Sequence, residues 1–144
     1  MKILMPIDGS NSSKNAMIRS LERGLLTGND VHVFVAIPDK ITGRGYHINP
    51  DVIEHVDESF EKHAKQTLEE AKGIFKRYNV EVTTDCAKGD AAKEILEYAD
   101  KIKADLIIMG NRGLGAFSKT LLGSVSSKVL SQAKSSVLIV KEGE

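Results

Sequence analysis

A glycine-spaced segment in the last third of the chain has the residue types and the spacing that bind phosphate. Gly110, Gly113 and Gly123 are separated by two and by nine residues, and Ser124 directly follows the last glycine. Glycine permits positive φ, which we expect at Gly113, and it lets backbone N–H groups approach oxygen atoms closely. A following helix N-terminus adds about half a positive charge, and basic residues such as Arg112 neutralise further charge. The segment therefore predicts a phosphate-binding loop.

Two common nucleotide-binding fingerprints are excluded in this segment. A Walker A motif needs a lysine after its last glycine, but Ser124 follows Gly123. The dinucleotide-binding motif G-x-G-x-x-G needs a glycine where Ser118 stands, three residues after Gly115. The alternative interpretation is a plain connection between a strand and a helix, whose glycines only form turns. The number and spacing of the glycines favour binding.

Asp8 is the second candidate, because it directly follows the first predicted strand. Ligands of open parallel sheets bind beyond the carboxyl ends of the strands, at the point where the strand order reverses. If the order is 3-2-1-4-5, Asp8 lies beside Gly110, which ends the fourth strand. Alternatively, Asp8 caps the helix that starts near Ser10, and Ser124 and Ser126 only begin or solvate the last helix.

Short apolar, β-branched runs alternate with longer amphipathic stretches, which predicts a parallel sheet covered by helices. We expect strands at residues 2–7, 31–37, 80–85, 104–110 and 136–141. We expect helices from Ser10 to about Leu26, from Asp51 to about Asn79 and after Gly89-Asp90, and a last helix that includes Leu121, Leu122, Val125 and Val129. Residues 38–50 lack periodicity and predict a mobile loop able to cover a ligand. The fold class is α/β, a three-layer doubly wound sheet in one domain over residues 1–144.

The amino-acid composition limits which classes of partner the protein is expected to bind. The 144 residues carry 20 acidic and 20 basic side chains, so no single-signed field attracts nucleic acid or an anionic membrane. No apolar run approaches the about 20 residues that cross a bilayer. The single cysteine, Cys86, has no disulfide partner, and no secretory segment opens the chain, so we expect a soluble, cytoplasmic protein. The four histidines lack zinc-site spacing and predict surface positions.

The whole chain resembles the ATP-binding subgroup of the universal stress protein family. That subgroup has a loop of the form G-2x-G-9x-G-S/T, and the segment from Gly110 to Ser124 matches it. Four further stretches stand in the family's order: ILMPIDGS at 3–10, DLIIMG at 105–110, LLGSVS at 121–126 and VLIV at 137–140.

The resemblance implies a fold, a ligand and a partner. The fold is Rossmann-like, of the adenine nucleotide alpha hydrolase type, with strand order 3-2-1-4-5. The ligand is ATP, with AMP or ADP as alternatives and Mg²⁺ or Mn²⁺ bridging the phosphates. Adenine would lie near Pro6, Asp8 and Ala36, and the ribose and phosphates near Met109, Gly110, Arg112, Gly113, Gly123, Ser124 and Val125. The partner is a second copy of the chain, paired through Val137 to Val140.

The leading functional expectation is a dimeric, ATP-dependent switch in regulation or stress response. The rival is an enzyme, a slow ATPase or an autophosphorylating protein, with Asp8 placing metal or water and Ser124 as phosphoacceptor. It ranks lower because the motif has no second acidic residue to hold a metal. A third class, a partner-binding module with an emptied pocket, would lack the loop glycines. Ala36 stands where a larger aliphatic residue often packs on adenine, which affects affinity.

Overall fold

The structure is a computed structural model that describes residues 1–39, 50–113 and 122–142. Its elements are β1 (Lys2–Pro6), α1 (Asn11–Glu22), β2 (Asp30–Ile37), α2 (Pro50–Arg77), β3 (Val82–Lys88), α3 (Ala91–Ile102), β4 (Leu106–Gly110), α4 (Ser124–Gln132) and β5 (Ser136–Val140). This is the predicted alternation of strands and helices. Most of the loop expected at 38–50, and residues 114–121 of the glycine segment, lie outside the described residues.

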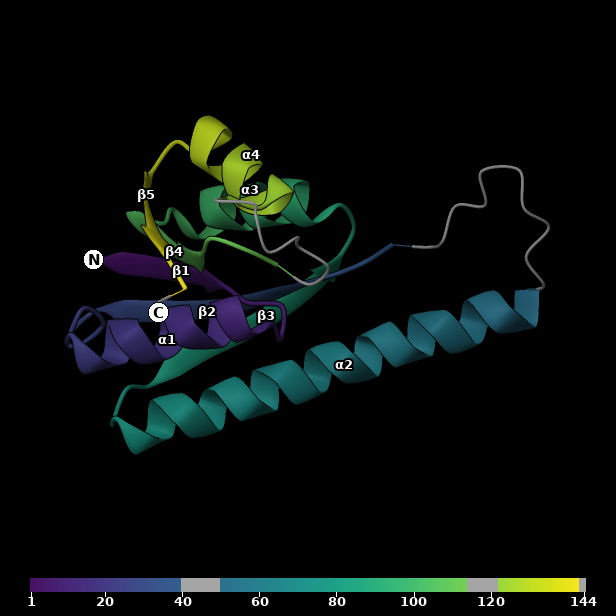
Figure 1. Cartoon of the computed structure of the whole chain (residues 1–144), viewed down its shortest axis with the longest axis horizontal. Coiled ribbons are helices and arrows are strands. Elements are labelled where there is room, and N and C mark those ends of the chain that lie inside the picture. The colour runs from purple at the N-terminus through teal and green to yellow at the C-terminus, as the bar shows by residue number, and fades with distance from the viewer. Residues whose placement is uncertain (40–49, 114–121, 143–144) are drawn as a thin grey trace.

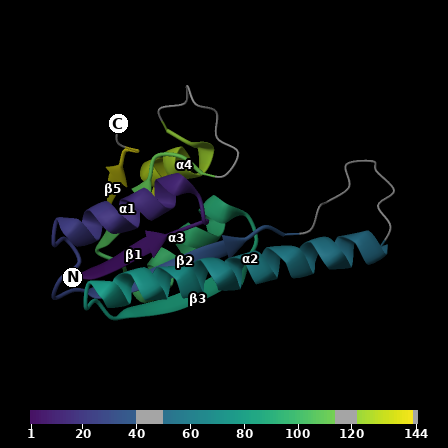
Figure 2. The same ribbon diagram turned by 60° about the horizontal axis from the view of Figure 1, so that its bottom comes forward.

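All neighbouring strands are parallel, and their order is β3-β2-β1-β4-β5, as expected. Figures 1 and 2 show α1 and α2 on one face of the sheet and α3 and α4 on the other. The chain winds one way from β1 to β3 and the other way from β4 to β5. The strand order therefore reverses between β1 and β4, where a parallel sheet opens a crevice at its carboxyl edge.

Alternate side chains of the inner strands belong to two hydrophobic cores, one on each face of the sheet. Ile3 and Met5 of β1 pack toward α1 and α2, whereas Leu4 packs toward α3 and α4. These three side chains are at most 1% exposed. Burying a side chain of this size contributes about 1.5–3 kcal/mol, so the two cores fix β1 and β4 firmly beside each other. The continuous apolar runs of the sequence reflect this coverage on both faces.

Several predicted boundaries were wrong, including the start of the fourth strand, which is Leu106 and not residue 104. Helix α1 ends at Glu22 and not near Leu26, because Gly24 takes φ +68°; Leu26 is buried by the connection instead. The third strand is Val82–Lys88 and not 80–85, since Asn79 has φ +57° and Val80 packs back beneath α2. The last helix begins at Ser124, which leaves Leu122 before it. At Leu26, an apolar residue buried by the connection imitated the periodicity of the helix.

Within the described part of the chain, no helix has the length and apolar composition needed to span a membrane.

Candidate functional site

A cavity of about 830 Å³ lies at the carboxyl edge of the sheet. Its volume is within the range of about 300–1,000 Å³ that small-molecule sites occupy. Residues of β1, β2, β4 and of all four helices, α1 to α4, line it. All ten residues nominated from the sequence are among them: Pro6, Asp8, Ala36, Met109, Gly110, Arg112, Gly113, Gly123, Ser124 and Val125.

Asp8 connects the end of β1 to the glycine loop. Its Oδ1 accepts a hydrogen bond from the N–H of Ser10 at 2.9 Å, and its Oδ2 lies 2.9 Å from where a Cβ on Gly113 would stand. The N-cap of α1 is Ser10, whose Oγ accepts from the N–H of Ser13 at 3.2 Å. The capping alternative for Asp8 is therefore wrong: its carboxylate holds the turn before the helix and faces the cavity.

Two of the three loop glycines, Gly110 and Gly113, leave space for neighbouring groups. A Cβ on Gly110 would stand 2.8 Å from the backbone oxygen of Ser12, because the start of α1 crosses the end of β4 at this point. A Cβ on Gly113 would stand too close to the carboxylate of Asp8, as described above. Neither glycine has φ in the left-handed region, so the expectation of positive φ at Gly113 was wrong. Gly123 has the loosest surroundings, with its nearest neighbours about 3.5 Å from the added Cβ.

The N-terminus of α4 is open to the cavity. Its N-cap is Gly123, with φ −67° and ψ 162°, so the N-cap residue has no side chain to cap the helix, and the first turn has no acidic residue. The N–H groups of Ser124, Val125 and Ser126 have no acceptor within the helix. The Oγ of Ser126 donates to the carbonyl oxygen of Gly110 at 2.8 Å, which ties α4 to β4. Ser124 is exposed and lines the cavity. Such a terminus favours an anion.

Arg112 is the guanidinium in the described wall of the cavity. Its backbone N–H donates to the Oγ of Ser12 at 3.2 Å, and its Nη1 lies 3.7 Å from the Oε2 of Glu142. Its Nε is buried and has no hydrogen-bond partner among the residues that the structure describes. Asp8 is the carboxylate in the same wall. The described wall thus combines one strong cation, one carboxylate and a helix N-terminus.

Helix α2 supplies a wall that the sequence analysis missed. Figure 1 shows its N-terminal half extending past the carboxyl edge of the sheet. Phe60, His63 and Ala64 from this helix line the cavity. His63 is exposed, as expected of a surface histidine, but its Nε2 lies 3.1 Å from the backbone oxygen of Asp8. With the proton on Nε2, it donates to that oxygen. In the sequence, only the position of His63 beside the apolar stripe of the helix indicated that it could line the cavity.

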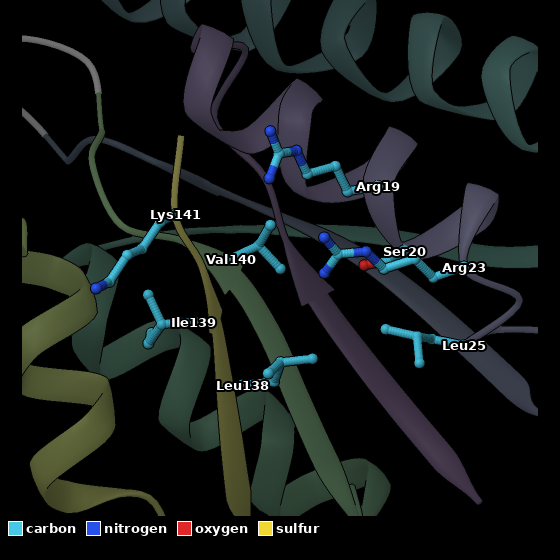
Figure 3. A pocket seen from close by; sticks show the side chains of 8 residues that line it. All are labelled: Arg19, Ser20, Arg23, Leu25, Leu138, Ile139, Val140 and Lys141. Carbon is cyan, nitrogen blue, oxygen red and sulfur yellow. The ribbon is translucent and has the colours of Figure 1, made fainter. Parts of the chain in front are cut away.

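A smaller hollow of about 210 Å³ lies between α1 and β5 (Figure 3). Arg19, Arg23 and Leu25 line it from α1 and the segment after it, and Leu138 and Val140 line it from β5. None of the ten nominated residues contributes to it. In the described ranges, no three His, Cys, Asp or Glu side chains gather closely enough to hold a metal ion by themselves. The larger cavity is therefore the candidate site.

A doubly wound parallel sheet with a cavity where its strand order reverses defines the class of Rossmann-like α/β domains that bind ligands at this edge. Residues 1–141 match the model of the universal stress protein family, and the chain belongs to that family.

Relatives and solved structures agree with this assignment. The chain is 31% identical to universal stress protein MJ0531 of Methanocaldococcus jannaschii, in an alignment that covers 98% of this chain and 82% of that protein. It is similar to the solved structure of hypothetical protein MJ0577, with a TM-score of 0.84, 25% identity and coverage of 99% and 96% of the two chains. It is also similar to a universal stress protein solved in complex with cAMP, with a TM-score of 0.70, 26% identity and coverage of 97% and 96%.

Proposed function

We propose that this protein binds ATP in the 830 Å³ cavity and acts as a dimeric, nucleotide-dependent regulatory or stress-response protein of the cytoplasm. The observation that carries the proposal is that all ten residues predicted from the sequence line one cavity, beside a helix N-terminus whose N-cap residue is glycine. The similar universal stress protein in complex with cAMP supports an adenine nucleotide as the ligand class.

The two ends of the cavity suit the two ends of a nucleotide. Pro6 and Ala36 provide apolar surface at the ends of two neighbouring strands, where the adenine ring would pack, and Met109 at the end of the third strand would lie near the ribose. The N–H groups at the start of α4, which have no acceptor within the helix, and the guanidinium of Arg112 would provide the donors for phosphate oxygens.

The donor set fits a divalent cation bound with the nucleotide. Mg²⁺ is commonly held by one or two carboxylates together with substrate phosphates, and Asp8 supplies one carboxylate to the cavity. Mg²⁺ or Mn²⁺ would neutralise phosphate charge there. The rival function, slow hydrolysis or autophosphorylation at Ser124, rests on this same carboxylate. We place binding first, because one carboxylate in the described wall suffices for a bound cation but leaves no second acidic group to orient water.

The proposed dimer would form at the open edge of the sheet. Strand β5 is an edge strand, and its Leu138 remains 38% exposed. An apolar edge strand is a template for pairing with another chain. Pairing β5 with its counterpart in a second copy would satisfy the free backbone groups and cover Leu138 beside the hollow of Figure 3.

Titration calorimetry of the full chain with ATP, ADP and AMP, with and without Mg²⁺, tests the binding proposal. Ser124→Asp is the informative variant, because a carboxylate in the first turn stabilises a helix but repels phosphate at the same place. We expect it to weaken ATP binding by about tenfold, equivalent to about 1.4 kcal/mol.

Ser127→Asp is the matched control, since it adds the same charge one turn later on α4, outside the cavity lining. We expect it to leave ATP affinity nearly unchanged. Absence of measurable binding of all three nucleotides to the wild-type chain would overturn the proposed function. Equal loss in both variants would move the phosphate site away from the start of α4.

A further inference from the structure

The residues that follow β5 are fastened to the first residues of the glycine loop. The N–H of Glu142 donates to the Oδ1 of Asn111 at 3.0 Å. Asn111 is only 3% exposed, and the same oxygen accepts from the Oγ of Ser12 at 3.3 Å. One residue earlier, the carbonyl oxygen of Lys141 accepts from Asn15 Nδ2 at 3.2 Å. The chain that leaves the edge strand is therefore held against the start of α1 and the base of the loop.

This attachment brings a carboxylate to the cation of the cavity. The Oε2 of Glu142 lies 3.7 Å from the Nη1 of Arg112, and the two side chains are 35% and 30% exposed. At this distance the pair is electrostatic and is not a close hydrogen bond. The Nε of Arg112 is meanwhile buried and has no partner among the described residues. The guanidinium thus keeps donor capacity for a stronger acceptor while Glu142 holds it from one side.

We infer that Glu142 competes with nucleotide phosphate for Arg112, and that this competition links the phosphate end of the cavity to the C-terminal end of β5. The inference rests on the proposed function, because it assigns a control element to the same site. A phosphate group offers a guanidinium two parallel, charge-assisted hydrogen bonds, which the distant carboxylate of Glu142 does not. Phosphate therefore displaces Glu142, and Glu142 lowers the affinity for phosphate.

The link acts in both directions by thermodynamic necessity. If Glu142 weakens phosphate binding by a given factor, bound phosphate weakens the hold of Arg112 on Glu142 by the same factor. Glu142 lies two residues beyond Val140, the last residue of β5. A nucleotide that carries phosphate would thereby weaken the attachment of the residues that follow β5. Adenosine, which has no phosphate, would leave it in place.

Glu142→Gln tests the inference without disturbing the attachment to Asn111, which uses the backbone N–H of residue 142. Titration calorimetry with ATP, AMP and adenosine at low salt measures the effect. We expect ATP to bind about two- to fivefold more tightly, the range that a partly exposed ion pair of this kind produces. Adenosine affinity should stay the same, with AMP between the two.

Glu69→Gln is the matched control, because it makes the same charge change on the exposed face of α2, where Glu69 pairs with Lys72 at 3.2 Å. Any general effect of net charge on ATP binding appears equally in both variants. ATP binding to the wild-type chain with equal affinities in the two variants would overturn the role of Glu142 and leave the proposed function standing. Failure of every form of the protein to bind nucleotide would overturn both. An equal gain for adenosine and ATP would also overturn the role, because it would not involve phosphate.

Discussion

Replacement of Gly113 by alanine is expected to displace the carboxylate of Asp8. The backbone at position 113 is not left-handed, so alanine itself adopts it without strain, but the new Cβ would stand 2.9 Å from Asp8 Oδ2. The carboxylate relieves this contact by rotating, and it then loses the hydrogen bond from the N–H of Ser10, now 2.9 Å long. Loss of such a bond to a partly buried charged group costs about 1–2 kcal/mol. We expect the free energy of unfolding to fall by that amount.

A double-mutant cycle separates this cause from others. Urea unfolding is measured for the wild type, Gly113→Ala, Asp8→Ala and the double variant. Without the Asp8 carboxylate there is no collision, so alanine at position 113 should cost less than about 0.5 kcal/mol, leaving a coupling of about 1 kcal/mol. Gly123→Ala is the control, since its nearest neighbours lie about 3.5 Å away and should give no coupling with Asp8. An equal cost of Gly113→Ala with and without Asp8 would refute the reasoning.

Three other outcomes follow from the structure. Gly110→Ala should lower stability by about 1–3 kcal/mol, because its Cβ would stand 2.8 Å from the fixed backbone oxygen of Ser12; an unchanged thermal midpoint would contradict this. Burial, with the charge of Asp85 as a further cause, raises the pKa of Tyr98, so its stabilising contribution is present below the ordinary pKa of 10.0 and is lost as the pH rises through the raised value. Tyr98→Phe should therefore lose less stability between about pH 9 and pH 12 than the wild type in denaturant titrations. Leu138→Glu should convert the proposed dimer to a monomer in sedimentation experiments, and a monomeric wild type would count against that interface.

The fold and ten of the 22 residues that line the cavity were accessible from the sequence. The alternation of apolar runs and amphipathic stretches gave the order of the elements, and the strand order that the family resemblance implied is the one observed. The ten nominated residues share one edge of the sheet because parallel strands place all their carboxyl ends on that side. Whether they bind ATP stays a prediction. Amphipathic patterning showed which face of α2 packs on the sheet, but not that the helix extends beyond it and places His63 at the cavity.

By itself, the sequence determined the residue types at the ends of the strands and the spacing of Gly110, Gly113 and Gly123. Only the tertiary structure decided why those glycines are needed, since Gly110 and Gly113 make room for Ser12 and Asp8 and do not need positive φ. These contacts join parts of the chain about 100 residues apart, and short-range patterns carry no information on such distances. The start of the predicted phosphate-binding loop is thus the place where the ends of β1 and β4, the start of α1 and Glu142 meet. Glu142 follows β5, and its carboxylate lies near the guanidinium of Arg112.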